Sequence, residues 1–181
     1  MSSTFYTKLQ SPLGDLLVIS DGRFLTGLYL PNQKLLRQKI SGQKISGQEH
    51  SMAQNDTHPF WSNVKHQLDN FFLKEQFVFD IPVRPKGTEF QLKVWKALQT
   101  ISLGQILTYK ELALMINHPK AVRAVGFANA CNPISIVIPC HRVIGSNGHL
   151  TGYAGGLSNK QWLLNHEKHM IHSKEEFKIV A

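Results

Sequence analysis

The stretch TYKELALMINHPKAVRAVGFANA, residues 108–130, decides how this chain folds. Thr108 and Glu111 have the spacing of a capping box, which predicts the start of a short helix. A tight connection at residues 117–119 follows, and residues 120–130 favour a second short helix. Two short helices joined by a few residues are typical of a helix-turn-helix.

Small residues mark the second helix of this pair. Ala121, Ala124 and Ala128 share one face at helical spacing. Such a face lets the backbone approach another surface closely, either a neighbouring helix of the same domain or an outside partner. Arg123 projects a cation from the same helix, and this favours the outside partner.

Outward from this pair, the chain divides into two predicted domains. A longer helix, opened by a second capping box at residues 88–91, completes a mostly α domain over residues 86–172, and residues 173–181 are predicted to be a tail. Residues 1–85 predict a small α/β domain, an antiparallel sheet plus one helix. Its predicted elements are strands at 5–9, 13–20, 23–30 and 77–81, a loop at 31–56, a helix at 59–73 and a linker at 82–85.

Composition and charge fit a globular protein with a polyanionic partner. The 181 residues are 42% hydrophobic and 18% charged, and no apolar run approaches the roughly 20 residues of a membrane span. Two cysteines build no disulfide framework and no secretory signal is visible, so we expect a cytoplasmic monomer without membrane contact. Of the net charge of +8, residues 86–172 contribute six, with nine Lys or Arg against three Asp or Glu. Nucleic acid is the first candidate partner, and a charge that serves only solubility is the alternative.

The chemistry of the chain is concentrated in NPISIVIPCHRV, residues 132–143. An apolar run that predicts a buried strand ends at a proline and delivers Cys140 to its edge, followed directly by His141. A thiolate nucleophile needs a base or a cationic environment, which His141 and Arg142 would supply, and Glu167 would orient the histidine. These residues alone leave a protease, an acyltransferase, a redox thiol, an alkyl acceptor and an inert buried thiol open.

The residues around Cys140 resemble the active-site motif of the O6-alkylguanine-DNA alkyltransferases, also called methylated-DNA–protein-cysteine methyltransferases. The resemblance starts from PCHRV at 139–143 and is close over residues 86–168, whereas residues 1–85 are similar in architecture only. It implies a ribonuclease-H-like N-terminal domain and a helix-turn-helix of winged-helix type. Further positions that match in order and spacing are Tyr109, Arg123, Asn132, Pro133, GYAGG at 152–156 and KQWLLNHE at 160–167.

The resemblance implies binding of double-stranded DNA that carries an O6-alkylguanine. The second helix of the pair would enter the minor groove, and Arg123 would fill the gap left by a flipped-out nucleotide. The flipped base would lie beside Cys140, and Lys160 would support Tyr109. The implied DNA- and substrate-binding residues are Arg123, Ala121, Ala124, Ala128, Val143, Tyr153, Ala154 and Lys160.

The implied reaction is direct-reversal repair, the transfer of the alkyl group from O6-alkylguanine to Cys140, with O4-methylthymine as a further candidate substrate. His141 would deprotonate the thiol through a water and Glu167 would orient His141. Tyr109 would protonate guanine N3, and Asn132 would hold the active-site strand and bond near the thiol. The thioether product is not hydrolysed, so each molecule would act once and without a cofactor.

The sequence differs from some relatives at positions that bear on metal binding and on substrate range. Some relatives bind zinc through N-terminal cysteines, but no cysteine precedes Cys131 here, so we expect no metal site and an inert Cys131. Ala154 stands where some relatives have a serine, which puts the substrate range in question. Two alternatives stay open: a damage-sensing protein of the same fold that binds alkylated DNA without repairing it, and a cysteine hydrolase.

Overall fold

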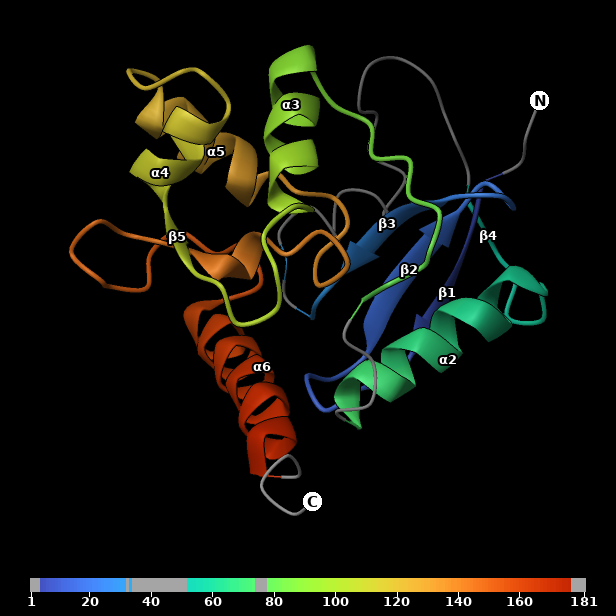
Figure 1. Ribbon diagram of the computed structural model, residues 1–181. Helices are drawn as coiled ribbons and strands as arrows, with labels where there is room; N and C mark the ends of the chain where they lie inside the picture. Colours follow the sequence, from blue (N-terminus) through green and yellow to red (C-terminus); the bar gives the residue numbers. More distant parts are fainter. Residues whose placement is uncertain (1–3, 32, 34–51, 74–77, 177–181) are drawn as a thin grey trace.

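A computed structural model describes residues 4–31, 33, 52–73 and 78–176, and Figure 1 shows two parts in contact. The first part is a sheet with one helix along it, and the second is built mainly from helices. This arrangement confirms the predicted fold class, an α/β domain followed by a mostly α domain. None of the helices in these ranges is both long and apolar enough to span a bilayer.

The sheet has the strand order β3-β2-β1-β4. Its first three strands are antiparallel neighbours as predicted, and Gly22 turns the chain between β2 and β3 at φ 94°, a conformation that favours glycine. The predicted loop at 31–56 is wrong at β4, which pairs in parallel with β1, while residues 32 and 34–51 lie outside the described part. A strand of two residues is too short to leave a pattern in the sequence. The strands are β1 (Phe5–Leu9), β2 (Leu16–Ser20), β3 (Leu25–Tyr29) and β4 (Ala53–Gln54).

Helix α2 (Phe60–Phe72) runs along the sheet in Figure 1 and packs an aromatic and aliphatic face against the core. Burial of each large apolar side chain contributes about 1.5–3 kcal/mol relative to exposure, so this face fixes the helix in place. The helix agrees with the predicted one at 59–73. Its buried apolar residues are Trp61, Val64, Leu68 and Phe71.

The predicted strand at 77–81 is wrong over its described residues. Contact with the sheet comes later in the chain: Leu25 N–H donates to Pro82 O at 2.8 Å, and Arg84 N–H donates to Leu25 O at 2.9 Å. Because proline has no N–H, the pairing stays a single bridge between Leu25 and Val83.

The second part contains the predicted helix pair. Each of the first two helices begins with the expected capping box, in which a threonine and the third residue of the helix bond each other's backbone N–H. A parallel pair of two-residue strands joins the start of α4 to the residues after Cys140. The elements are α3 (Glu89–Leu98), β5 (Leu107–Thr108), α4 (Tyr109–Met115), α5 (Val122–Ala130), β6 (Val143–Ile144) and α6 (Leu157–Glu176). Helix α6 continues to Glu176, through the first four residues of the predicted tail.

The segment before Cys140 is buried but is not the strand that we predicted. It makes a single bridge, between Ile134 and Leu28 of β3, and then turns at Ile136, whose φ is 72°. Leu28 N–H donates to Pro133 O at 2.8 Å, and Ser135 N–H donates to Leu28 O at 2.9 Å. The edge of the N-terminal sheet therefore holds the segment that leads to Cys140.

The cap of α4 gives a first test of this fold. We expect Thr108→Ala to lower the free energy of unfolding by about 1 kcal/mol, because the Oγ1 acceptor for Glu111 N–H is lost. Urea unfolding of both proteins measures the change, and Thr108→Ser, which keeps the hydroxyl, is the matched control. Equal stability of the alanine variant and the unchanged protein would contradict the role of the cap.

Candidate active site

Cys140 begins a short 3₁₀ helix, Cys140–Arg142, and its side chain is buried. Asn132, also buried, donates from Nδ2 to the Cys140 sulfur at 3.0 Å and to Ile138 O at 2.8 Å, so one amide fixes both the thiol and the turn that carries it. Burial raises the pKa of the Cys140 thiol, and the Asn132 hydrogen bond and the nearby Lys160 ammonium oppose this rise. The expected contact between Asn132 and the thiol is therefore present.

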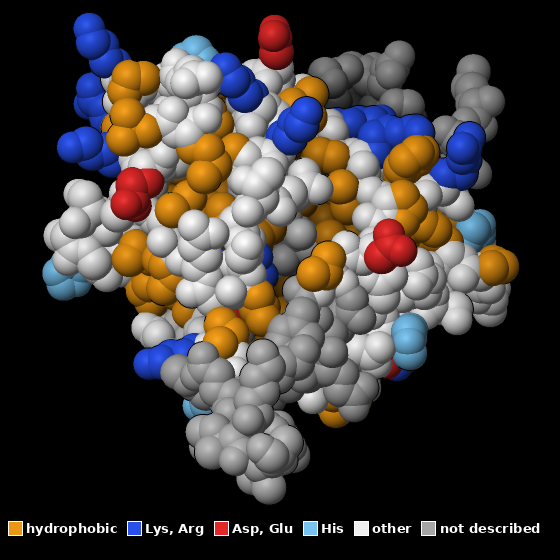
Figure 2. Space-filling model, in the orientation of Figure 1, with side chains coloured by type: hydrophobic (Ala, Val, Ile, Leu, Met, Phe, Trp, Pro, Cys, Tyr) orange, Lys and Arg blue, Asp and Glu red, His pale blue; other side chains and the backbone are white. Residues whose placement is uncertain are grey.

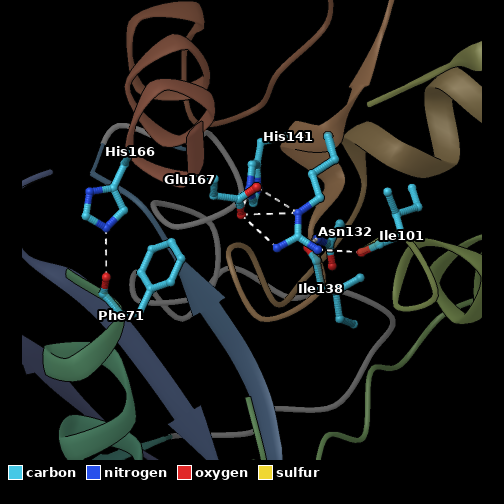
Figure 3. A network of polar contacts seen from close by, with 8 residues as sticks. Phe71, Ile101, Asn132, Ile138, His141, His166 and Glu167 are labelled. Atoms are coloured by element: carbon cyan, nitrogen blue, oxygen red, sulfur yellow. Dashed lines mark hydrogen bonds and ion pairs between the residues drawn. The ribbon is translucent and has the colours of Figure 1, made fainter. Parts of the chain in front are cut away.

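Glu167 of α6 accepts hydrogen bonds from the two residues that follow Cys140 in the chain, and Figure 3 shows these contacts. His141 Nε2 lies 2.9 Å from Glu167 Oε1, and Arg142 grips both carboxylate oxygens, with Nε 2.9 Å from Oε2 and Nη2 2.7 Å from Oε1. Burial by itself would raise the pKa of Glu167, but His141 and Arg142 outweigh it and lower that pKa to about 2. Glu167 is thus negatively charged at neutral pH and holds both neighbours.

The carboxylate fixes the chemistry of the histidine ring. An ionised carboxylate only accepts hydrogen bonds, so Nε2 of His141 carries the hydrogen of this bond. Nδ1 is buried and has no hydrogen-bond partner among the described residues. Glu167 therefore fixes the orientation of the ring through Nε2, and Nδ1 is the nitrogen left for a further partner.

A second hydrogen-bond network surrounds Tyr109. Its hydroxyl donates to Thr151 O at 3.1 Å, and the buried Lys160 donates from Nζ to the same oxygen at 2.9 Å and to Val143 O at 2.6 Å. Burial lowers the pKa of Lys160 to about 8, whereas burial raises the pKa of Tyr109. The predicted support of Tyr109 by Lys160 therefore runs through a shared carbonyl.

Of the residues predicted to line the base pocket (Val143, Tyr153 and Ala154), only some lie near Cys140. The Tyr153 hydroxyl is buried. Burial is the main cause that raises the pKa of Tyr153, and the nearby Cys140 adds to it. Val143 is buried and its carbonyl already holds Lys160, whereas Ala154 is exposed.

The exposed side of α5 differs from the predicted small-residue face. Ala124 and Arg123 are exposed and Ala121 is half-buried, but the assignment of Ala128 to this face is wrong. Ala128 is 1% exposed and packs into the core, where its carbonyl accepts a hydrogen bond from Trp95 Nε1 at 2.8 Å. Phe127, 69% exposed, interrupts the small residues one turn after Arg123.

Two polar residues of the site went unrecognised in the sequence. Arg142 was expected to add positive potential only, yet it clamps Glu167 and also donates from Nη1 to Ile101 O. Asn129 donates from Nδ2 to Cys140 O at 3.2 Å from within α5. A buried polar residue in an otherwise apolar helix was the available signal for Asn129. Within the described ranges, no cluster of three or more His, Cys, Asp or Glu side chains is arranged to hold a metal ion.

Comparison with known proteins agrees with this geometry. Residues 89–169 match the family model "6-O-methylguanine DNA methyltransferase, DNA binding domain", and residues 4–85 match its "ribonuclease-like domain". The methylated-DNA–protein-cysteine methyltransferase of Haemophilus influenzae is 42% identical over 175 residues, which cover 93% of this chain and 88% of that protein. This chain belongs to the methylated-DNA–protein-cysteine methyltransferase family.

Solved members of the family share the fold as well as the sequence. The OGT of Mycobacterium tuberculosis in complex with DNA is 38% identical and superposes with a TM-score of 0.81 over 92% of this chain and 94% of that one. The constitutive methylated-DNA–protein-cysteine methyltransferase of Bacillus subtilis is 39% identical over 168 residues, 91% of this chain and 95% of that protein. The similarity therefore extends over both parts of the fold.

Proposed function

We propose that this methyltransferase-family protein repairs DNA by direct reversal, moving the alkyl group of an O6-alkylguanine in duplex DNA onto Cys140. The observation that carries the proposal is the buried thiol, oriented by Asn132 at 3.0 Å and followed in the chain by His141, which is paired with Glu167. The same site lies next to a helix-turn-helix. A hydrolase needs the thiol and the base alone, and gives no reason for that neighbour.

The first chemical step is deprotonation of the thiol. A buried neutral thiol is a weak nucleophile, because burial raises the pKa of Cys140. His141 Nδ1 would take the proton through a bridging water, and Glu167 would stabilise the imidazolium that results. The thiolate then attacks the alkyl carbon while the bond from that carbon to O6 breaks.

The leaving group needs a proton. Tyr109 would donate its hydroxyl proton to guanine N3, so that the base departs as neutral guanine and not as an anion. The hydroxyl of Tyr109 donates a hydrogen bond to Thr151 O at 3.1 Å, and this donor role supports the assignment. The product at Cys140 is a thioether, and a carbon–sulfur bond of this kind is not hydrolysed, so one molecule accepts one alkyl group and needs no cofactor.

DNA would bind at α5. Figure 2 shows Lys and Arg side chains gathered over α4 and α5, and Lys110 of α4, Lys120 of the connection and Arg123 of α5 are exposed. Positive charge there attracts the phosphates, and Arg123 would enter the duplex through the minor groove in place of the flipped nucleotide. We assign this role to a domain of residues 86–172, and a supporting role to residues 1–85.

Intact-protein mass after mixing with a duplex that contains one O6-methylguanine tests the function. We expect the mass to rise by one methylene group, on the peptide that contains Cys140, and to saturate at one per protein. Tight binding without a mass change would assign the protein to damage sensing. Neither binding nor a mass change would contradict the proposal as a whole.

Replacement of Arg123 tests the mode of DNA binding. We expect Arg123→Ala to lower the rate on duplex by about tenfold to a hundredfold, the effect of losing one well-placed contact, with little change on the free base O6-methylguanine. Quenched-flow transfer assays measure both rates. Lys65→Ala removes an equal charge from an exposed site on α2 and should leave both rates unchanged. Equal losses on duplex and free base would contradict the insertion of Arg123.

A further inference from the structure

Asn129 of α5 is a buried polar residue next to Cys140. Its side chain is 1% exposed, and Nδ2 donates to Cys140 O at 3.2 Å. One turn earlier on α5, Gly126 faces Tyr109 so closely that an added methyl group would lie 3.7 Å from Cδ1 of that ring. Residues three apart on a helix are neighbours, so Asn129 lies beside Tyr109 as well as beside Cys140.

The amide of Asn129 is only half satisfied. Its Oδ1 is buried and has no hydrogen-bond partner among the described residues. An unpaired buried acceptor destabilises a fold, and an apolar side chain of similar size would fill the same space without that cost. The bond from Nδ2 to Cys140 O gives the asparagine a structural role, but the unpaired Oδ1 is a cost that points to a further role for this amide.

We propose that Asn129 is a positioning residue for proton transfer: it donates a hydrogen bond from Nδ2 to the Tyr109 oxygen as Tyr109 gives up its proton, while it holds the backbone of Cys140. This inference rests on the proposed function. An amide nitrogen carries two hydrogens, and the bond to Cys140 O uses one of them. The second hydrogen is available to the phenolic oxygen.

The protons and electrons of the transfer balance with this assignment. The sulfur–carbon bond forms as the carbon–O6 bond breaks, and the electron pair of that bond passes into the purine. N3 takes the phenolic proton, which leaves Tyr109 as a phenolate. The thiol proton, held on His141 since the first step, compensates the new negative charge until solvent exchange restores both groups.

The electrostatics of Tyr109 agree with a donor at this position. Burial raises the pKa of Tyr109, and a negative Cys140 would raise it further, whereas hydrogen bonding with Thr151 and Asn129 opposes the rise. A hydrogen bond to the phenolate is stronger than one to the neutral phenol, since one partner is charged. Asn129 therefore favours the product of the proton transfer over the starting state.

A double-mutant cycle, combined with a substrate that lacks the N3 atom, tests the proposal. Methyl transfer is timed for the unchanged protein, Asn129→Leu, Tyr109→Phe and the double variant, on duplexes with O6-methylguanine or its 3-deaza analogue, which has no N3 to protonate. We expect Asn129→Leu to slow transfer from O6-methylguanine by about tenfold to a hundredfold. On the 3-deaza base, and in the Tyr109→Phe background, the same substitution should change the rate by less than about threefold.

Controls separate this role from a structural one and from the proposed function. Thermal unfolding of Asn129→Leu should occur within a few degrees of the unchanged protein, and Asn129→Ala is the second variant if leucine does not fold. An equal slowing on both bases and in both backgrounds would overturn the proposal, because it would show that Asn129 only shapes Cys140. Absence of transfer by the unchanged protein would instead reject the proposed function.

Discussion

Cys140→Ser abolishes methyl transfer and leaves binding to O6-methylguanine duplex within about 1 kcal/mol of the unchanged protein: this is the largest effect that we expect. A serine hydroxyl is a much weaker acid than a thiol, and His141 is too weak a base to ionise it. The oxygen is smaller than sulfur and still accepts a hydrogen bond from Asn132, so the surrounding turn is kept.

The chain offers a matched control for this variant. Cys131, at the end of α5, is the other free thiol and is half-buried, and burial raises its pKa too. Cys131→Ser should therefore accept one methyl group at the normal rate. Intact mass and a gel-shift titration on the same duplex measure transfer and binding. Transfer by Cys140→Ser, or its loss in Cys131→Ser, would move the acceptor away from Cys140.

Glu167→Gln should have the second-largest effect, on stability and on transfer together. Removing one partner of a buried ion pair leaves Arg142 charged and uncompensated, which costs about 3–5 kcal/mol of unfolding free energy. The variant also loses the charge that stabilises protonated His141, so we expect transfer to slow by at least about a hundredfold. Urea unfolding at pH 7 and quenched-flow transfer measure the two effects.

The stability difference should depend on pH in a defined direction. The folded protein holds the pKa of Glu167 at about 2, below its ordinary value of 4.5, so folding favours the ionised form. That shift corresponds to about 3 kcal/mol of stability, fully present above pH 5 and lost as the pH falls towards 2. Glu167→Gln should lack this slope. Asp69→Asn, at an exposed pair with Lys65, should retain it, and an identical acid profile for Glu167→Gln would refute the assignment.

Local signals in the sequence predicted the helices well. Both capping boxes formed as expected, because each is made by residues three positions apart. The strand before Cys140 was wrong for a physical reason: a short apolar run shows burial but not backbone conformation. Here the run is buried by the edge of β3 and turned by Asn132, and neither contact is local.

The site was predicted where a motif carried it and missed where only the fold does. Cys140, His141 and Glu167 were candidates from their residue types and spacing, the resemblance gave them their roles, and the structure joins His141, the neighbour of Cys140, to Glu167. The clamp from Arg142 to Glu167 spans 25 residues, so no local pattern announces it. Ala128 was misplaced because helical spacing shows which residues share a face, but not whether that face is outside.

Adjacent residues of α6 tie the two halves of the molecule to one helix. His166 Nε2 lies 2.7 Å from Phe71 O, at the end of α2, while Glu167 faces the opposite way toward His141 (Figure 3). One residue inserted or deleted earlier in α6 would rotate both side chains by about 100° and remove both contacts at once. Insertions and deletions before His166 in α6 should therefore not be tolerated during evolution. Substitutions on the exposed face of the helix, at Gln161 or Asn165, should be tolerated.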